Sequence, residues 1–168
     1  MGAKKWKGKE KYSNLFSPIR MRNVRAKNRI IAAPTSPSMI TTEGHFTPEM
    51  IAYLEEKALG GAGIVTYGEA IVHSATGKSH NKQLQLDSFG VKQGMAQAAR
   101  AIHNAGAYAN IQLSHGGKYG GLASVGGDHL DKCNTAYGPS HEVTPVGEVQ
   151  EMSKELISVS YTHLTLPT

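Results

Sequence analysis

Short apolar runs alternate with segments of helical periodicity along the chain. The run from Asn28 to Ala33, closed by Pro34, predicts a short buried strand. Two further strands are predicted at 64–67 and 108–113. Before the first of them, residues 16–24 favour a short extended or hairpin segment.

Two helices are predicted between these strands. The first begins with Thr47 as N-cap and Pro48 as first helical residue, and it ends at the glycine-rich stretch 60–63. The second begins after Ser88 as N-cap and ends at 104–106. A further helix is predicted to start near 145–152. The apolar faces of the first two are Met50, Ile51, Leu54 and Ala58, and Val91, Met95, Ala98 and Ile102.

The order strand, helix, strand, helix, strand predicts parallel βαβ units. Loops after the strands are long, at 34–46, 71–87 and 114–145, while loops after the helices are short. This asymmetry favours a TIM (β/α)8 barrel over a dinucleotide-binding sheet, which would place G-x-G-x-x-G where Pro34 to Pro37 stand. A whole barrel needs roughly 250 residues. We therefore expect an α/β fold that is the N-terminal part of a barrel, about three βα units and incomplete.

The positive charge is concentrated at one end. Residues 1–30 hold ten basic side chains and one acidic one, a net charge of +9, whereas the remainder has a net charge of −4. We interpret residues 1–12 as a basic polar leader, and we expect neither nucleic acid nor a membrane as partner. The leader has no apolar core typical of a secretory signal, and the single Cys133 excludes an intrachain disulfide, so a cytoplasmic location is expected.

Metal and phosphate motifs are weak. The eight histidines have no metal-ligand spacing, and no metal is expected. In the glycine-rich stretch 116–121, Tyr119 follows Lys118 where a phosphate-binding loop of the Walker type needs Ser or Thr.

Four motifs, in order and at compatible spacing, resemble the Old Yellow Enzyme family, in its bacterial NADH:flavin oxidoreductase and 2,4-dienoyl-CoA reductase branch. They are Asn14-Leu-Phe-Ser-Pro-Ile19, Lys27-Asn-Arg-Ile-Ile-Ala-Ala-Pro34, Gly60-Gly-Ala-Gly-Ile-Val65 and Ile111-Gln-Leu-Ser-His-Gly-Gly-Lys118. The resemblance runs from about residue 12 to 157.

The resemblance implies an FMN-binding barrel that passes a hydride from NAD(P)H through the flavin to an activated C=C bond of an unsaturated carbonyl or acyl-CoA substrate. It implies that Gln112 hydrogen-bonds the pyrimidine edge of the flavin, and that backbone at Gly68 or Ala70, in the turn after the second strand, approaches the ring. His115 and Lys118 are candidates for substrate or loop contacts. The residues that would line the ring are Pro34, Thr35 and Ser36.

The resemblance places the family's catalytic residues and phosphate loops beyond this stretch, so we assign no catalytic residue here and expect the chain to be inactive on its own. Larger members of the branch carry a 4Fe-4S cluster and FAD further on. The alternatives are a non-catalytic truncation product or a small basic binding module; the oligomeric state is not predicted.

These interpretations divide the chain into the leader, a barrel part at 13–157 and a tail at 158–168. The tail is rich in Thr and β-branched residues and does not continue the preceding helical pattern. Its sequence resembles the translation of a sequencing adapter, and we expect it to be non-native.

Overall fold

The computed structural model describes residues 8–120, 136–144 and 147–158. Most of the predicted leader and tail, Cys133, Pro145 and the second half of the glycine-rich loop lie outside these residues. Near the N-terminus, the short helix α1 (Ser13–Phe16) precedes an antiparallel hairpin of β1 (Ile19–Met21) and β2 (Val24–Ala26). The predicted hairpin is confirmed.

The central element is a parallel sheet with β4 (Ile64–Ile71) in the middle. β3 (Ile31–Thr35) pairs with the first half of β4, with Ile31 opposite Ile64, and β6 (Tyr108–Ser114) runs along its other side. The two-residue strand β5 (Leu84–Gln85) pairs with the last two residues of β4, beyond the point where β3 ends. The three predicted strands and their parallel arrangement are confirmed.

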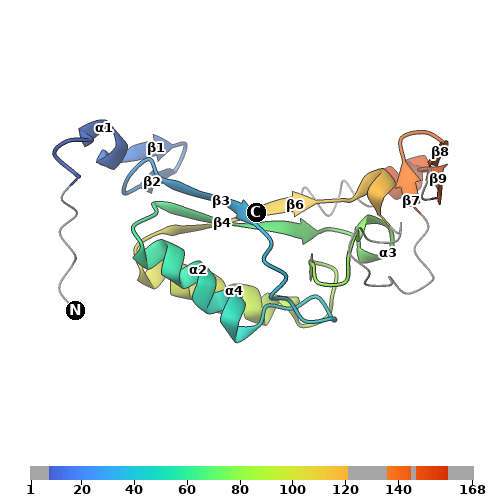
Figure 1. Ribbon diagram of the computed structural model, residues 1–168, viewed down its shortest axis with the longest axis horizontal. Coiled ribbons are helices and arrows are strands. Elements are labelled where there is room, and N and C mark those ends of the chain that lie inside the picture. The colour runs from blue at the N-terminus through green and yellow to red at the C-terminus, as the bar shows by residue number, and fades with distance from the viewer. Residues whose placement is uncertain (1–7, 121–135, 145–146, 159–168) are drawn as a thin grey trace.

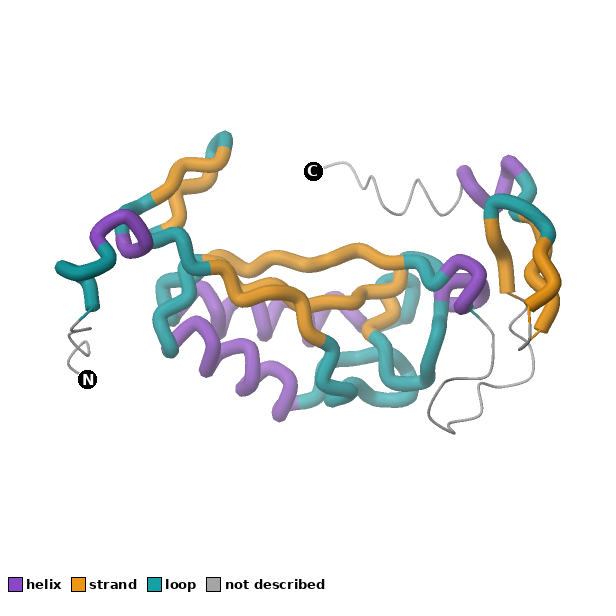
Figure 2. Tube along the Cα trace, turned by 45° about the horizontal axis from the view of Figure 1, so that its top comes forward, coloured by secondary structure: helices purple, strands orange, loops and turns teal. Residues whose placement is uncertain are grey.

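Helices α2 (Pro48–Leu59) and α4 (Val91–Asn104) cover one face of this sheet, as Figures 1 and 2 show. Both insert apolar residues against β4, where Val65 and Tyr67 are buried. The Phe46 ring packs edge-on against Tyr67 with a centroid distance of 4.8 Å. Fully burying a large apolar side chain stabilises a fold by about 1.5–3 kcal/mol, so this helix–sheet layer is the main source of stability. The helix residues in the core are Met50, Leu54, Ala58, Val91, Ala98 and Ile102.

The observed ends of α2 and α4 can be compared with the predicted capping residues. Thr47 is the N-cap of α2, and its side chain accepts a hydrogen bond from the Met50 amide at 3.2 Å, as predicted. After α2, Gly61 has a φ of +108°, a conformation that glycine adopts without a Cβ clash. The second helix is confirmed, but its predicted N-cap Ser88 was wrong, because Gly90 with φ of +86° precedes Val91. Ser88 instead donates to the Glu43 carbonyl and contacts His45 Nε2.

Two strand predictions need correction. β3 does not stop at Pro34 but continues to Thr35, and it is mostly exposed rather than buried, with Ile31 56% exposed. Both follow from its position: β3 pairs only with β4 in the described part of the chain, and an edge strand tolerates a proline that cannot donate a ladder hydrogen bond. β4 is four residues longer than predicted and buried along nearly its whole length. Gly68 and Ala70 therefore lie inside a strand and not in a turn.

The loops after β4 and β6 hold small elements that the polar sequence there does not indicate. They contain α3 (Ser74–Gly77) and the 3-10 turn η1 (Gly117–Tyr119). A second sheet, in the order β7-β9-β8, lies at the opposite end of the central sheet from the hairpin (Figure 2). It consists of β7 (Ala136–Gly138), β8 (Glu142–Thr144) and β9 (Gly147–Glu151).

The helix predicted near 145–152 was therefore wrong for the described residues. Residues 147–151 form β9, and a helical turn follows only at 154–158. Within β9, Val149 is the one apolar residue, and it is fully buried between the two partner strands. Its neighbours Glu148 and Gln150 are exposed, because successive side chains of a strand point to opposite faces.

Candidate functional site

Three predicted residues, one from each long strand, meet on the sheet face opposite α2 and α4, which no described helix covers and which we call the uncovered face (Figure 1). The α-carbon of Gly68 is so close to its neighbours that an added Cβ would lie 2.6 Å from Pro34 Cβ and 3.2 Å from Gln112 Cβ. Ile111 packs in the helix-facing core, so Gln112, the next residue of β6, points to the other face. Glycine at 68 thus leaves a flat floor between a proline ring and a carboxamide.

The same face carries a second polar contact, two residues earlier in both β4 and β6. Asn110 donates from Nδ2 to Thr66 Oγ1 at 3.2 Å, and both residues precede Gln112 and Gly68 by two positions. Thr66 is 3% exposed. The uncovered face therefore presents hydrogen-bonding groups from two adjacent strands, in a region where most buried strand residues are apolar.

Thr35 and Ser36 are placed differently from Pro34. The Thr35 hydroxyl accepts from Lys57 Nζ at 2.6 Å and lies 3.4 Å from the Tyr53 hydroxyl, so its side chain faces α2. Ser36 lies beside Tyr67, which also faces the helices. In the described part of the chain, Ser36 Oγ and Tyr67 Oη are buried and have no hydrogen-bond partner.

The phenol of Tyr67 has a shifted pKa. Burial raises it, the nearby Ser36 hydroxyl and the Leu84 backbone oppose that rise, and the negative charge of Glu69 adds to it. The phenol therefore stays protonated at neutral pH. Two adjacent buried hydroxyls without hydrogen-bond partners cost stability. A further polar group that bonded to them would remove this cost.

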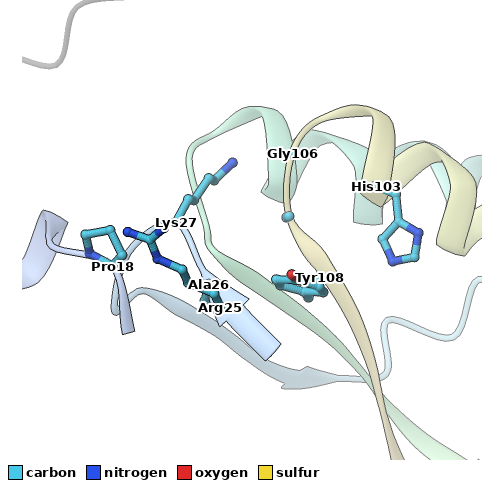
Figure 3. Close-up of a pocket in the computed structure, with 8 residues that line it drawn as sticks. Pro18, Arg25, Ala26, Lys27, His103, Gly106 and Tyr108 are labelled. Atoms are coloured by element: carbon cyan, nitrogen blue, oxygen red, sulfur yellow. The ribbon is translucent and has the colours of Figure 1, made fainter. Parts of the chain in front are cut away.

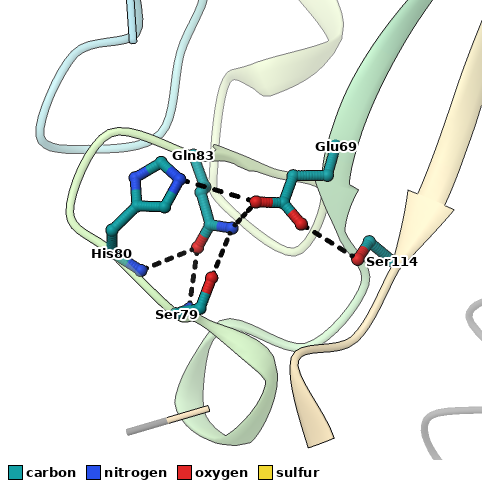
Figure 4. Close-up of polar contacts among 5 residues, drawn as sticks. All are labelled: Glu69, Ser79, His80, Gln83 and Ser114. Carbon is teal, nitrogen blue, oxygen red and sulfur yellow. Dashed lines mark hydrogen bonds and ion pairs between the residues drawn. The ribbon is translucent and has the colours of Figure 1, made fainter. Parts of the chain in front are cut away.

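Glu69 is a site residue that sequence reasoning missed. Its carboxylate contacts Gln83 Nε2, lies 3.5 Å from His80 Nε2 and accepts from Ser114 Oγ at 3.3 Å (Figure 4). The hydrogen bond from His80 lowers the pKa of this carboxyl most, and Gln83, the charge of His80 and Ser114 act in the same direction against partial burial. The available signal was a lone carboxylate within the apolar run 64–71.

Ala70 is fully buried, and its backbone pairs with both β5 and β6. The β4–β6 register shifts between Tyr67 and Ala70, so the strand is irregular at the glycine and the carboxylate. The two β4 candidates, Gly68 and Ala70, thus flank this irregularity.

His115 lies at the end of β6 in a defined hydrogen-bond chain. The Gly117 amide donates to His115 Nδ1 at 3.0 Å, so that nitrogen carries no proton and Nε2 is the protonated one. Nε2 then donates to Thr76 Oγ1 at 2.9 Å, and Thr76 Oγ1 is hydrogen-bonded to His73 Nδ1 at 2.8 Å. Burial, and to a lesser degree the charge of His73, lower the pKa of His115.

Lys118 is directed to the second sheet. Its ammonium lies 3.3 Å from a carboxylate oxygen of Glu142 on β8, and both side chains are almost half exposed. His115 and Lys118, three residues apart, therefore contact different elements, α3 and β8. The structure does not bring them together.

A separate hollow of about 590 Å³ lies at the other end of the sheet, between the hairpin and the start of β6 (Figure 3). Its walls include Arg25, Lys27, His103 and Tyr108. Lys27 Nζ donates to the Ala105 carbonyl at 3.1 Å, beside the end of α4. None of the residues predicted to bind a cofactor lines this hollow.

Among the described residues, no three His, Cys, Asp or Glu side chains come close enough to hold a metal ion. No helix in that part of the chain is long and apolar enough to cross a membrane.

Comparison with known proteins identifies the fold. The chain is 29% identical to a 2-naphthoyl-CoA reductase whose structure matches 90% of this chain with a TM-score of 0.77. The Old Yellow Enzyme from Pichia sp. matches 91% with a TM-score of 0.76 at 18% identity, which shows the fold alone. This chain covers 24% and 43% of those proteins. The predicted fold class, part of an α/β barrel that is not closed within this chain, is confirmed.

A sequence relative and a family model complete the assignment. The chain is 31% identical over 107 residues to an NADH oxidase from Thermoanaerobacter brockii; the match covers 64% of this chain and 16% of that protein. The chain thus spans about a sixth of the length of that relative. Residues 14–162 match the model of the NADH:flavin oxidoreductase / NADH oxidase family. The predicted relationship to the Old Yellow Enzymes is confirmed, and this chain belongs to the NADH:flavin oxidoreductase / NADH oxidase family.

Proposed function

We propose that this chain supplies the part of a flavin-dependent oxidoreductase that receives the isoalloxazine ring of FMN. The observation that carries the proposal is the meeting of Pro34, Gly68 and Gln112 on the uncovered face of the sheet. A planar ring needs a floor without side chains, which glycine offers, and a polar edge with both a donor and an acceptor, which a carboxamide offers.

Each remaining candidate has a role within this proposal. The backbone of Gly68 or Ala70 approaches the ring, and Thr35 contributes its backbone, since its side chain is bonded to Lys57. Ser36 also contributes its backbone, because its hydroxyl lies beside Tyr67 on the helix side of the sheet. His115 and Lys118 shape the loop beyond the ring. When bound, FMN would accept and pass on a hydride; the protein residues position it and exclude water.

We infer that NAD(P)H is the reductant and that an unsaturated carbonyl compound or acyl-CoA is the substrate. The family of the chain supports the first inference, and the 2-naphthoyl-CoA reductase supports an acyl-CoA for the second. We propose a 4Fe-4S cluster and FAD only for further parts of a larger enzyme, outside this chain. The match covers 16% of the NADH oxidase, so a protein of that length is long enough to contain such parts. The division into leader, barrel part and tail, and a cytoplasmic location, also remain proposals.

The experiment that tests the site is a titration of the whole chain with FMN, riboflavin and lumiflavin, followed by the change in flavin fluorescence. Phosphate loops of such barrels follow the seventh and eighth strands, so the three flavins are expected to bind weakly and within about threefold of one another. Gln112→Leu is expected to abolish the response. The matched control is Gln97→Leu, which changes an exposed glutamine of α4.

Absence of binding by all three flavins would refute the ring site. Binding of FMN alone would show instead that the phosphate dominates recognition, which this arrangement does not predict. A salt-sensitive response to nucleic acid in place of flavin would favour the basic binding module.

A further inference from the structure

Glu69 lies at the point where the proposed ring site meets the loop after β4. It stands between Gly68 and Ala70 and is the only acidic residue in β4. Its side chain is one-third exposed, in a strand whose other residues are buried. A carboxylate costs free energy in such a position unless it is well bonded, so its partners indicate what it does.

The first partner, Gln83, connects Glu69 to the loop. Gln83 is fully buried, and its Oε1 accepts from the backbone amides of Ser79 and His80 at 2.8 and 3.1 Å. Its Nε2 donates to Glu69 Oε1 and, at 2.9 Å, to Ser79 Oγ. Both donors and both acceptor positions of the carboxamide are used, so the conformation of residues 79–83 depends on the carboxylate at one end of this network (Figure 4).

The second side of the carboxylate faces β6. Ser114 donates to Glu69 Oε2, and Ser114 lies two residues after Gln112 in the same strand. Residues two apart in a strand share a face. Glu69 therefore bridges the loop 79–83 and the part of β6 that carries the proposed pyrimidine contact.

We propose that Glu69 is a positioning residue of the flavin site, with two effects. Its carboxylate clamps the loop 79–83 against β4 and β6, which holds the backbone of Gly68 and Ala70 in place. Its negative charge disfavours the anionic reduced flavin relative to the oxidised form, and so makes the bound flavin a stronger reductant. This inference rests on the proposed function, because it concerns the same site.

The ionised state of Glu69 has support beyond a single contact. Among the described residues, the groups that face its two oxygens are Gln83, His80 and Ser114, all able to donate a hydrogen bond. No carboxylate of the described residues contributes to the pKa shift of Glu69, and, besides burial, the negative charge of Glu69 raises the pKa of the Tyr67 phenol. A charge that reaches Tyr67 is in range to act on a ring seated beside Gly68.

The test separates the clamp from the charge. Glu69→Gln retains an oxygen that accepts from Gln83 but removes the charge, whereas Glu69→Ala removes both. Glu56→Gln, at an exposed position of α2, is the matched control. For each full-length chain, the dissociation constants of oxidised and of dithionite-reduced FMN are measured under argon, and amide hydrogen exchange is followed at Ser79 and His80.

We expect Glu69→Gln to bind oxidised FMN like the parent and reduced FMN about tenfold more tightly, the smallest effect that one nearby charge usually produces. Glu69→Ala is expected to weaken binding of oxidised FMN and to speed exchange at Ser79 and His80. The control should change neither quantity.

Equal ratios of the two dissociation constants in the parent and in Glu69→Gln would overturn the effect of the charge. Unchanged exchange in Glu69→Ala would overturn the clamp, and faster exchange throughout the chain would show a general loss of stability instead. If the parent bound neither form of FMN, the flavin site itself would be refuted and this role of Glu69 with it.

Discussion

At the residue scale, Gly68 is a position in the sheet with no room for a side chain. Its neighbours Pro34 and Gln112 occupy the space that any side chain would need. We predict that Gly68→Ala destabilises the chain by about 1–3 kcal/mol, the usual cost of overpacking, and abolishes flavin binding. Urea denaturation measures the first effect. Gly8→Ala, where the nearest atom lies 3.6 Å from the added Cβ, should change stability little; equal losses in both variants would contradict the prediction.

His115 predicts a pH dependence of stability. Its folded pKa is lowered from 6.5 by burial, so the unfolded chain binds a proton at this site at a higher pH than the folded chain does. The stability from neutral His115 is complete above the unfolded pKa and is lost as the pH falls from there through the folded pKa. The proton would also displace the Gly117 amide from Nδ1.

The measurement is the thermal midpoint of the parent and of His115→Asn between about pH 8 and pH 5. The parent should lose more stability on acidification than the variant. His103→Asn, which changes an exposed histidine of α4, should follow the parent. Parallel curves for the parent and His115→Asn would show that the hydrogen-bond chain does not titrate as inferred.

Single residues also show which parts of the site could be predicted from the sequence. Pro34 and Gln112 were identified through the family motifs and Gly68, with Ala70 as its alternative, through the wider resemblance; their contact depends on strand pairing between residues far apart in the chain. Glu69 was missed because its partners Gln83 and Ser114 lie 14 and 45 residues away. No pattern of neighbouring residues predicts contacts between residues so far apart in the chain.

At the element scale, the start of α2 depends on one side chain. The hydroxyl of Thr47 accepts from the Met50 amide and also donates to the Met39 carbonyl at 3.0 Å, so it joins the helix to the preceding loop. We predict that Thr47→Ala lowers the free energy of unfolding by about 1 kcal/mol. Thr42→Ala, which removes a hydroxyl that donates to the exposed carboxylate of Glu43, should cost less. Both are measured by urea denaturation.

The two helices differ in how far their sequences determine their starts. Thr-Pro is a strong local signal, since the threonine caps and the proline needs no hydrogen-bond partner. Ser88 is an equally good cap by composition, but His45 and the Glu43 carbonyl bind its hydroxyl, and the helix begins after Gly90. Tertiary partners outcompeted the local interaction.

At the scale of the whole molecule, this chain contributes one covered face and one uncovered face of a parallel sheet. A catalytic site of a barrel is built from loops at the ends of several strands around the ring. We predict that the purified chain with FMN consumes NADH or NADPH no faster than FMN alone, measured by absorbance of the nicotinamide. Turnover above that rate, removed by Gln112→Leu, would show that these strands suffice.

The proposed tail leads to a separate prediction. If residues 158–168 are foreign to the fold, removing 159–168 should leave the thermal midpoint of the chain unchanged. A lower midpoint after the deletion would show that these residues contribute to folding. Resequencing of the locus is the independent check, because an uninterrupted genomic reading frame through these codons would refute the adapter origin.

The sequence by itself determined the alternation of three strands and two helices, the cap of α2 and the apolar faces that cover the sheet, because these follow from local conformational preference and periodicity. Only the tertiary structure decided that β3 is exposed and that 147–151 is a strand. It also decided that the Glu69 carboxylate, next to Gly68, bonds to Gln83 in the following loop. Those outcomes depend on which distant segments pair and on what each leaves uncovered, and a single stretch of chain does not contain that information.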